Sequence, residues 1–178
     1  MSLPAATEPF AWFLVAALAF SRGMDFLSTW LVTPRLLLET NPLMRRVRWG
    51  RMALLNAPLL GLPFLHEGLA ITFVVTSLLV AGTNLANGAL ARGLGERRQL
   101  ESQLAALRRM GLAAALAMNT AGALLVCLGG ALVMALALPA ESRGWWAGLG
   151  VVMFGAAVLV HVNWGLVRLA RQARRRRP

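Results

Sequence analysis

The apolar stretch "FAWFLVAALAFSRGMDFLSTWLVT", residues 10–33, decides the fold class of this chain. It exceeds the roughly 20 residues that an α-helix needs to cross about 30 Å of hydrocarbon. Because a segment inside a bilayer must satisfy its own backbone hydrogen bonds, the stretch is predicted to be a transmembrane helix. It nevertheless contains Asp25, the only aspartate in the sequence, and Arg22 lies one helical turn before it. The sequence therefore predicts a membrane span that holds a charge pair.

The composition of the whole chain agrees with a membrane class. Of its 178 residues, 58% are hydrophobic, and the mean hydropathy is +0.63. A single domain of this length could not bury so much apolar surface in a water-facing core. The formal net charge is +11, and all 18 basic residues counted as Lys or Arg are arginines. Most of these arginines lie at the ends of apolar segments, which indicates membrane topology, so no nucleic-acid partner is expected.

Five hydrophobic segments follow one another, and we expect them to form one transmembrane domain over residues 1–178. The second segment is interrupted by Asn56, Pro58, Gly61 and Pro63, so it is predicted either to cross as a kinked helix or to be re-entrant. The predicted fold class is an all-α integral membrane protein, a five-helix transmembrane bundle. The expected spans are 10–33, 49–65, 68–91, 112–138 and 145–169.

The distribution of arginines predicts the orientation of this bundle. Basic connections alternate with connections that hold few or no basic residues, as the positive-inside rule requires for five spans. The N-terminus is then outside and the C-terminus cytoplasmic, in a bacterial inner (plasma) membrane. The connection 93–110 is predicted to be an amphipathic helix on the cytoplasmic surface. The basic tail, residues 170–178, is expected to meet the anionic lipid of the inner leaflet.

Polar side chains inside the predicted spans gather in their cytoplasmic halves. A charged side chain at this depth costs about 3 kcal/mol on insertion scales, so such groups face protein or water rather than lipid. One interpretation is a polar cavity that opens toward the cytoplasm. The other is a structural Arg22–Asp25 pair with separate interhelical hydrogen bonds elsewhere. His161 and Asn163 lie on nearly opposite sides of their helix, so they compete to face inward. The candidates are Arg22, Asp25, Thr29, Asn84, Asn87, Asn119 and His161.

The first connection adds two candidates and a resemblance. After the apolar residues 36–38 come Glu39 and the turn-forming pair Asn41-Pro42, which places Glu39 and Asn41 near the mouth of the predicted cavity. The pattern Asp25, Thr29, Glu39, Asn41-Pro42-Leu43 resembles that of a family of small prokaryotic multi-pass membrane proteins of unknown function. The resemblance covers residues 25–43 and implies no activity.

Motifs of known catalytic or cofactor chemistry are missing from the sequence. It has no H-E-x-x-H, P-loop, G-x-S-x-G or CxxC pattern, and Cys127 is the only cysteine. We therefore expect no cofactor and no metal site, and we assign no catalytic residue.

Two functional hypotheses remain. The leading one is a non-enzymatic accessory or assembly subunit that docks through its helices and a basic cytoplasmic face. Small-residue helix faces would then hold a protein partner or a second copy. The alternative is a small transporter or intramembrane enzyme with a polar cavity around Asp25. A water-accessible pocket lined by Asp25 and Asn87 would favour the alternative, whereas a large apolar patch on one side would favour the subunit.

Overall fold

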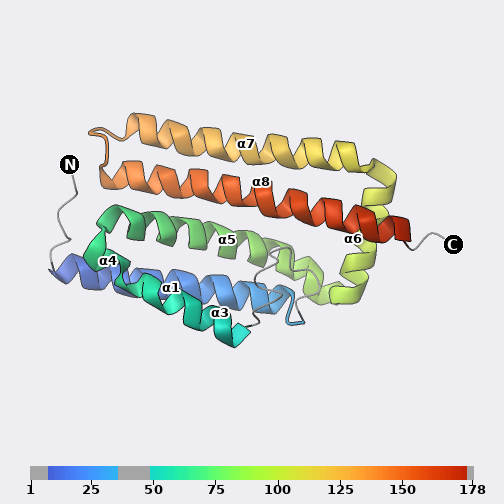
Figure 1. Ribbon diagram of the computed structural model, residues 1–178, viewed down its shortest axis with the longest axis horizontal. Coiled ribbons are helices and arrows are strands. Elements are labelled where there is room, and N and C mark those ends of the chain that lie inside the picture. The colour runs from blue at the N-terminus through green and yellow to red at the C-terminus, as the bar shows by residue number, and fades with distance from the viewer. Residues whose placement is uncertain (1–7, 36–48, 176–178) are drawn as a thin grey trace.

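The computed structural model describes residues 8–35 and 49–175, and every secondary-structure element within these ranges is helical (Figure 1). Four of the described helices are long and apolar enough to cross a membrane. These are α1 (Glu8–Val32), α5 (Glu67–Leu94), α7 (Leu112–Leu136) and α8 (Arg143–Arg175). The shorter elements are α3 (Trp49–Asn56), the 3₁₀ helix η1 (Ala57–Gly61), α4 (Leu62–Leu65) and α6 (Glu96–Met110).

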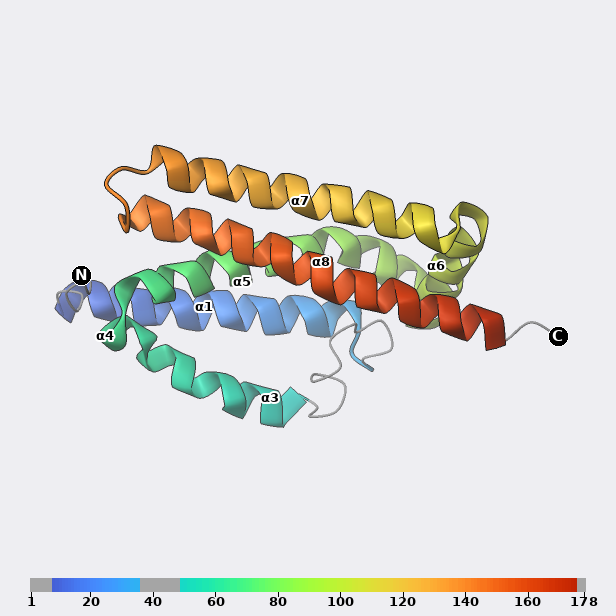
Figure 2. The same cartoon turned by 45° about the horizontal axis from the view of Figure 1, so that its top comes forward.

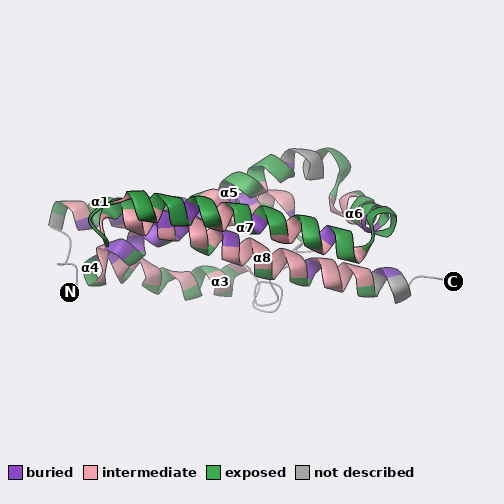
Figure 3. Cartoon of the chain, turned by 90° about the horizontal axis from the view of Figure 1, so that it is seen from above, coloured by how far each residue is buried: buried purple, intermediate pink, exposed green. Residues whose placement is uncertain are grey.

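Large apolar side chains cover the outside of these helices. Trp12 on α1 is 63% exposed, and Leu125 and Leu136 on α7 are 69% and 74% exposed. Exposed residues run along the whole outward surface of α7 (Figure 3). A water-soluble monomer rarely leaves so much apolar surface in contact with solvent. The length and the surface of the helices are therefore those of a protein embedded in lipid.

The long helices pack side by side in the order α1, α5, α8, α7 (Figure 1 and Figure 2). The contact of α1 with α5 buries Leu14, Leu18 and two serines, Ser21 and Ser28, while Ala70, Ser77 and Ala81 are buried on α5. Small side chains dominate this list, because helices without a water-driven hydrophobic effect gain most from close backbone approach. The central helix α5 therefore contacts α1 on one side and α8 on the other.

The second hydrophobic segment differs from the predicted single helix. Residues 49–65 form three consecutive pieces, α3, η1 and α4, and are not among the four helices long enough to span a membrane. Pro58 falls in the first turn of η1 and Pro63 in the first turn of α4, where proline starts a new helical piece because it lacks an N–H donor. The helices α1 and α5 begin at the same end of the molecule (Figure 1, Figure 2). The broken segment between them therefore carries the chain back toward that end before α5 begins.

The connection predicted as an amphipathic helix forms α6, which lies at the end of the molecule where α1 and α5 finish (Figure 1). Leu104 and Leu107 are buried against the bundle, whereas the arginines of the helix are exposed. Gly95 and Gly111 flank α6 with φ of +76° and +83°, a region that glycine adopts without strain. These two glycines let the chain turn sharply from α5 into α6 and from α6 into α7.

Glycines of α8 allow close approach to both of its neighbours. A Cβ added at Gly150 would lie 2.8 Å from the Cβ of Val75 and 2.9 Å from the carbonyl oxygen of Thr72, both on α5. At the same level the Thr76 hydroxyl donates to the Gly150 carbonyl at 2.9 Å. A Cβ at Gly148 would meet the carbonyl oxygen of Gly130 on α7 at 2.8 Å. The backbone of α8 is thus held tightly over its first half.

We predict that Gly150→Ala destabilises the fold and that the matched change Gly82→Ala does not. The added methyl group at Gly150 must displace backbone, which costs about 1–3 kcal/mol. At Gly82 no atom lies within 4 Å of the added Cβ, and alanine is the better helix former. Unfolding in mixed detergent micelles, followed by circular dichroism, measures both. Equal stability of the two variants would contradict the close packing of α5 on α8.

Candidate functional site

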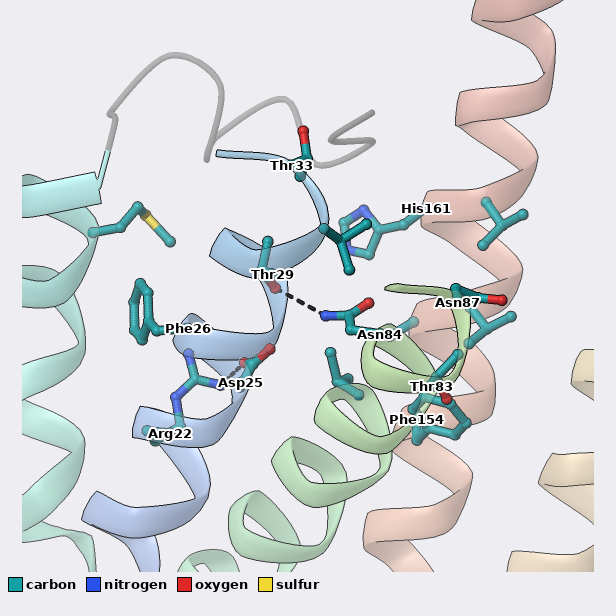
Figure 4. A pocket seen from close by; sticks show the side chains of 16 residues that line it. Arg22, Asp25, Phe26, Thr29, Thr33, Thr83, Asn84, Asn87, Phe154 and His161 are labelled. Carbon is teal, nitrogen blue, oxygen red and sulfur yellow. Dashed lines mark hydrogen bonds and ion pairs between the residues drawn. The ribbon is translucent and has the colours of Figure 1, made fainter. Parts of the chain in front are cut away.

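A cavity of about 460 Å³ lies between α1, α5 and α8, with Met52 of α3 at its edge. Its lining residues on α5 and α8 come after the tightly packed level of Gly150, where these two helices move apart toward the end that carries α6 (Figure 1, Figure 3). Apolar side chains form much of its wall, among them Phe26, Phe154 and Val158. Its polar lining consists of Arg22, Asp25, Thr29, Thr33, Thr83, Asn84, Asn87 and His161 (Figure 4).

Arg22 connects three segments of the chain at the base of this cavity. Its Nη1 donates to the Asp25 carboxylate at 2.9 Å, one turn along α1, and to the Ser77 hydroxyl of α5 at 3.1 Å. Its Nη2 donates to the Oδ1 of Asn56, the last residue of α3. The ring of Phe26 lies 5.8 Å from the guanidinium carbon. The guanidinium is therefore engaged by protein groups on each of its terminal nitrogens.

Asp25 is held as the partner of this guanidinium. The side chains of Arg22 and Asp25 are only 22% and 17% exposed, so both charges are largely withdrawn from solvent. A carboxylate at this depth is tolerated because an opposite charge compensates it. The Ser28 hydroxyl donates to the Asp25 carbonyl oxygen at 2.9 Å, which also satisfies a polar group on the buried face of α1. The charge pair is formally neutral as a unit.

Asn84 joins α5 to α1 above the charge pair. Its Nδ2 donates to the Thr29 hydroxyl at 2.9 Å and more weakly to the Ser28 hydroxyl at 3.4 Å (Figure 4). Both hydrogens of the amide nitrogen are accounted for by these two contacts. The amide carbonyl oxygen of Asn84 accepts no hydrogen bond from the described residues. The Asn84 side chain thus offers an acceptor to the cavity.

The α8 side of the cavity carries different polar groups. Thr83 and Asn87 project from α5 on the side away from Asp25, near Phe154, and His161 projects from α8 (Figure 4). The Thr83 hydroxyl donates back to the Leu79 carbonyl of its own helix at 2.8 Å. Within the part of the chain that the structure describes, neither Asn87 nor His161 has a hydrogen-bond partner. Their side chains are available to whatever occupies the cavity.

The structure brings together most of the predicted site residues but separates one. Arg22, Asp25, Thr29, Asn84, Asn87 and His161 all line the cavity. Asn119 does not: its Nδ2 donates to Asn163 at 2.8 Å, and Asn163 donates to the Thr120 hydroxyl at 3.1 Å. Asn119 therefore belongs to a polar contact between α7 and α8, on the opposite side of α8 from His161. Glu39 and Asn41 lie outside the described residues.

The role of Asn56 was not predicted from the sequence. The sequence indicated this residue only as an interruption of the second hydrophobic segment, whereas its side chain binds Arg22 and also donates to the Met52 carbonyl at 2.7 Å. An asparagine two residues before a proline in an apolar segment is the feature that could have indicated this contact, since a polar group at depth needs a partner. Ser77, buried on α5, acts in the same way.

Comparisons with known proteins provide no relative from which a function could be transferred. No family model, no characterised protein and no solved structure matches the chain. Among the described residues, no three His, Cys, Asp or Glu side chains gather in a way that could hold a metal ion. The hydrogen-bonding groups and the charge pair of the cavity are the features that define its chemistry.

We predict that Arg22→Ala lowers stability more than the double variant Arg22→Ala/Asp25→Ala. The single change removes the guanidinium that compensates the partly buried carboxylate of Asp25, at a cost of up to about 3–5 kcal/mol, and the second change removes that carboxylate. The control is Arg143→Ala, because Arg143 pairs with Glu67 at 2.6 Å but its side chain is 65% exposed, so the pair contributes about 0–1 kcal/mol. Unfolding midpoints in the same micelles compare the three variants. Parent-like stability of Arg22→Ala would show that water screens the pair.

Proposed function

We propose that this protein is a small multi-pass membrane protein that binds a small molecule in the cavity between α1, α5 and α8, as a transporter does. The observation that supports the proposal is the lining of that cavity, in which Asp25, Asn84, Asn87 and His161 from three helices face one space of about 460 Å³. Ligand pockets in proteins commonly have volumes of about 300–1,000 Å³ and combine apolar walls with a few polar groups.

The unpaired polar groups of the lining strengthen this proposal. Polar side chains within membrane spans usually face protein or a water-filled space, and here Asn87 is exposed and His161 is half-buried. The structural alternative, separate interhelical hydrogen bonds, accounts for Asn84 and for Asn119 but leaves Asn87 and His161 unexplained within the described residues. Binding or transport fits better than catalysis, because the Asp25 carboxylate is held by Arg22.

The proposal includes five membrane crossings, with the N-terminus outside and the C-terminus in the cytoplasm of a bacterial cell. The exposed arginines Arg97, Arg98, Arg108 and Arg109 are on α6, and the backbone N–H of exposed Arg35 donates to Glu96 of this helix at 3.1 Å. At the other end, Arg143 is compensated by Glu67 and stacks on Phe10 at 3.9 Å. The positive-inside rule then assigns the α6 end, with the cavity, to the cytoplasmic side, where anionic lipid is the expected partner.

A second candidate function is an accessory subunit that docks through α7. Ala113, Ala117 and Ala121 recur at four-residue intervals on this helix, and all three are exposed. Small residues at this spacing permit close approach of another transmembrane helix or of a second copy. This candidate leaves the cavity without a purpose, so we place it second.

Thiol labelling tests the proposed cavity and its orientation together. In a Cys127→Ala background, Val158→Cys places a thiol in the lining, whereas Val160→Cys, two residues further along α8, places it on a surface that is 63% exposed toward lipid. A water-soluble, membrane-impermeant maleimide reacts only where water reaches the thiolate. In inside-out membrane vesicles we expect Val158→Cys to be labelled at least about tenfold faster than Val160→Cys.

Two further positions set the orientation in the same assay. Arg98→Cys on α6 is expected to react only in inside-out vesicles, and Leu65→Cys, at the opposite end, only in right-side-out vesicles. Equal, slow labelling of Val158→Cys and Val160→Cys would remove the cavity as a ligand site. Labelling of Arg98→Cys and Leu65→Cys from one side would overturn the five crossings.

A further inference from the structure

Apart from the buried Nε of Arg22, the lining groups that have no hydrogen-bond partner among the described residues belong to amide and imidazole side chains. They are the carbonyl oxygen of Asn84, the amide of Asn87 and the imidazole of His161. Together they supply amide N–H donors, an imidazole that can donate or accept, and carbonyl acceptors. A ligand with hydroxyl or amide groups could satisfy each of them.

The charged groups of the lining are poorly placed to recognise an ion. Three of the five guanidinium N–H groups of Arg22 donate to Asp25, Ser77 and Asn56. Its Nε has no hydrogen-bond partner among the described residues but is buried, so a bound anion could not reach it from the cavity. The Asp25 carboxylate is compensated by the same guanidinium at 2.9 Å. Among the described residues, a net charge brought into this space would meet only the Arg22–Asp25 pair, whose two charges already offset each other.

The remaining wall of the cavity is apolar. Phe26 from α1, Val80 from α5, and Phe154 and Val158 from α8 surround the polar groups. A wholly polar solute would place its own hydroxyl groups against these apolar side chains, which is unfavourable. A ligand with an apolar chain beside a polar head would instead cover the side chains with its chain. The volume of about 460 Å³ accommodates a molecule that has both parts.

We infer that the ligand is an uncharged amphiphile, a molecule with a hydroxyl- or amide-bearing head and an apolar body. This inference rests on the proposed function, because it specifies the ligand of the same cavity. The head binds Asn84, Asn87 and His161, and the apolar body lies along Phe154 and Val158. Such a molecule could come from the bilayer or from water.

Photolabelling of the purified full-length protein in lipid nanodiscs tests this ligand class. The probes are a diazirine-bearing decyl alcohol and its carboxylate and ammonium counterparts, which share one tail and differ in the charge of the head. Labelled peptides are mapped by mass spectrometry. We expect the alcohol to label the lining residues of α5 and α8 at least about tenfold more than either charged probe, relative to labelling of lipid-facing α7.

A matched pair of variants localises the recognition. Asn87→Leu is expected to lower labelling of the lining by the alcohol about tenfold, whereas Asn119→Leu, the same change outside the cavity, leaves it unchanged. Competition experiments show where the ligand comes from. Displacement of the alcohol probe by 1,2-hexanediol indicates a ligand that arrives from water, and displacement by 1-decanol alone indicates one that arrives from the bilayer. Either result supports an uncharged amphiphile.

The outcomes separate the two levels of the proposal. Preferential labelling of the lining by a charged probe would overturn the uncharged amphiphile and leave the binding cavity standing. Failure of every probe to label the lining above the level of α7 would overturn the proposed function itself. Undiminished labelling of Asn87→Leu would show that the amide takes no part in recognition. The comparison of head groups needs no variant, so it stands even where a substitution impairs folding.

Discussion

A guanidinium placed at depth in an apolar helix must find its partners within the protein, and the architecture around the cavity depends on this constraint. Arg22 takes its partners from three segments: Asp25 on α1, Asn56 at the end of α3, and Ser77 on α5. Losing a partner of a buried charge costs several kcal/mol, far more than a contact between apolar side chains in lipid. The broken second segment, which has no buried residue in α3, is thereby fixed against α1.

Close packing at one end and separation at the other create the space beside this charge pair. Thr72 and Thr76 of α5 donate to the carbonyl oxygens of Trp146 and Gly150 on α8, at 3.0 and 2.9 Å. These contacts hold the two helices together over the first half of α8. Beyond them the two helices diverge (Figure 1, Figure 3), and the polar side chains of the cavity lie along this second half (Figure 4). The polar side chains and the cavity therefore lie in the same part of the molecule, toward the end that carries α6.

The sequence was sufficient for features that depend on a single helix. Apolar length predicted the long helices, and the i, i+3 spacing predicted the Arg22–Asp25 pair, which forms at 2.9 Å. The shared depth of the polar residues grouped Asp25, Asn84, Asn87 and His161, which line one cavity. It left open whether His161 or Asn163 faces inward, and in the structure His161 lines the cavity whereas Asn163 bonds Asn119.

Features that depend on the rotation of two helices against each other could not be predicted in this way. Asn119 shares the depth of the cavity residues, but α7 contacts α8 on the face that carries Asn163, so its amide bonds there instead. The partner of Arg22 on the second segment depended on where Pro58 breaks that segment, and no periodicity gives this position. The pattern of a single helix thus predicts the depth of a residue and its spacing from its neighbours. Which residues of two helices bond to each other depends on how the helices pack.

The central claim is that Arg22 energetically couples the broken second segment to the core helices. A double-mutant cycle of Arg22→Ala and Asn56→Ala, with the unfolding free energy measured in mixed micelles, tests it most directly. A hydrogen bond from a charged donor in a shielded site predicts a coupling energy of about 1.5–3 kcal/mol between the two positions. Additivity of the two changes to within about 0.5 kcal/mol would contradict the claim, because residues that do not interact show no coupling.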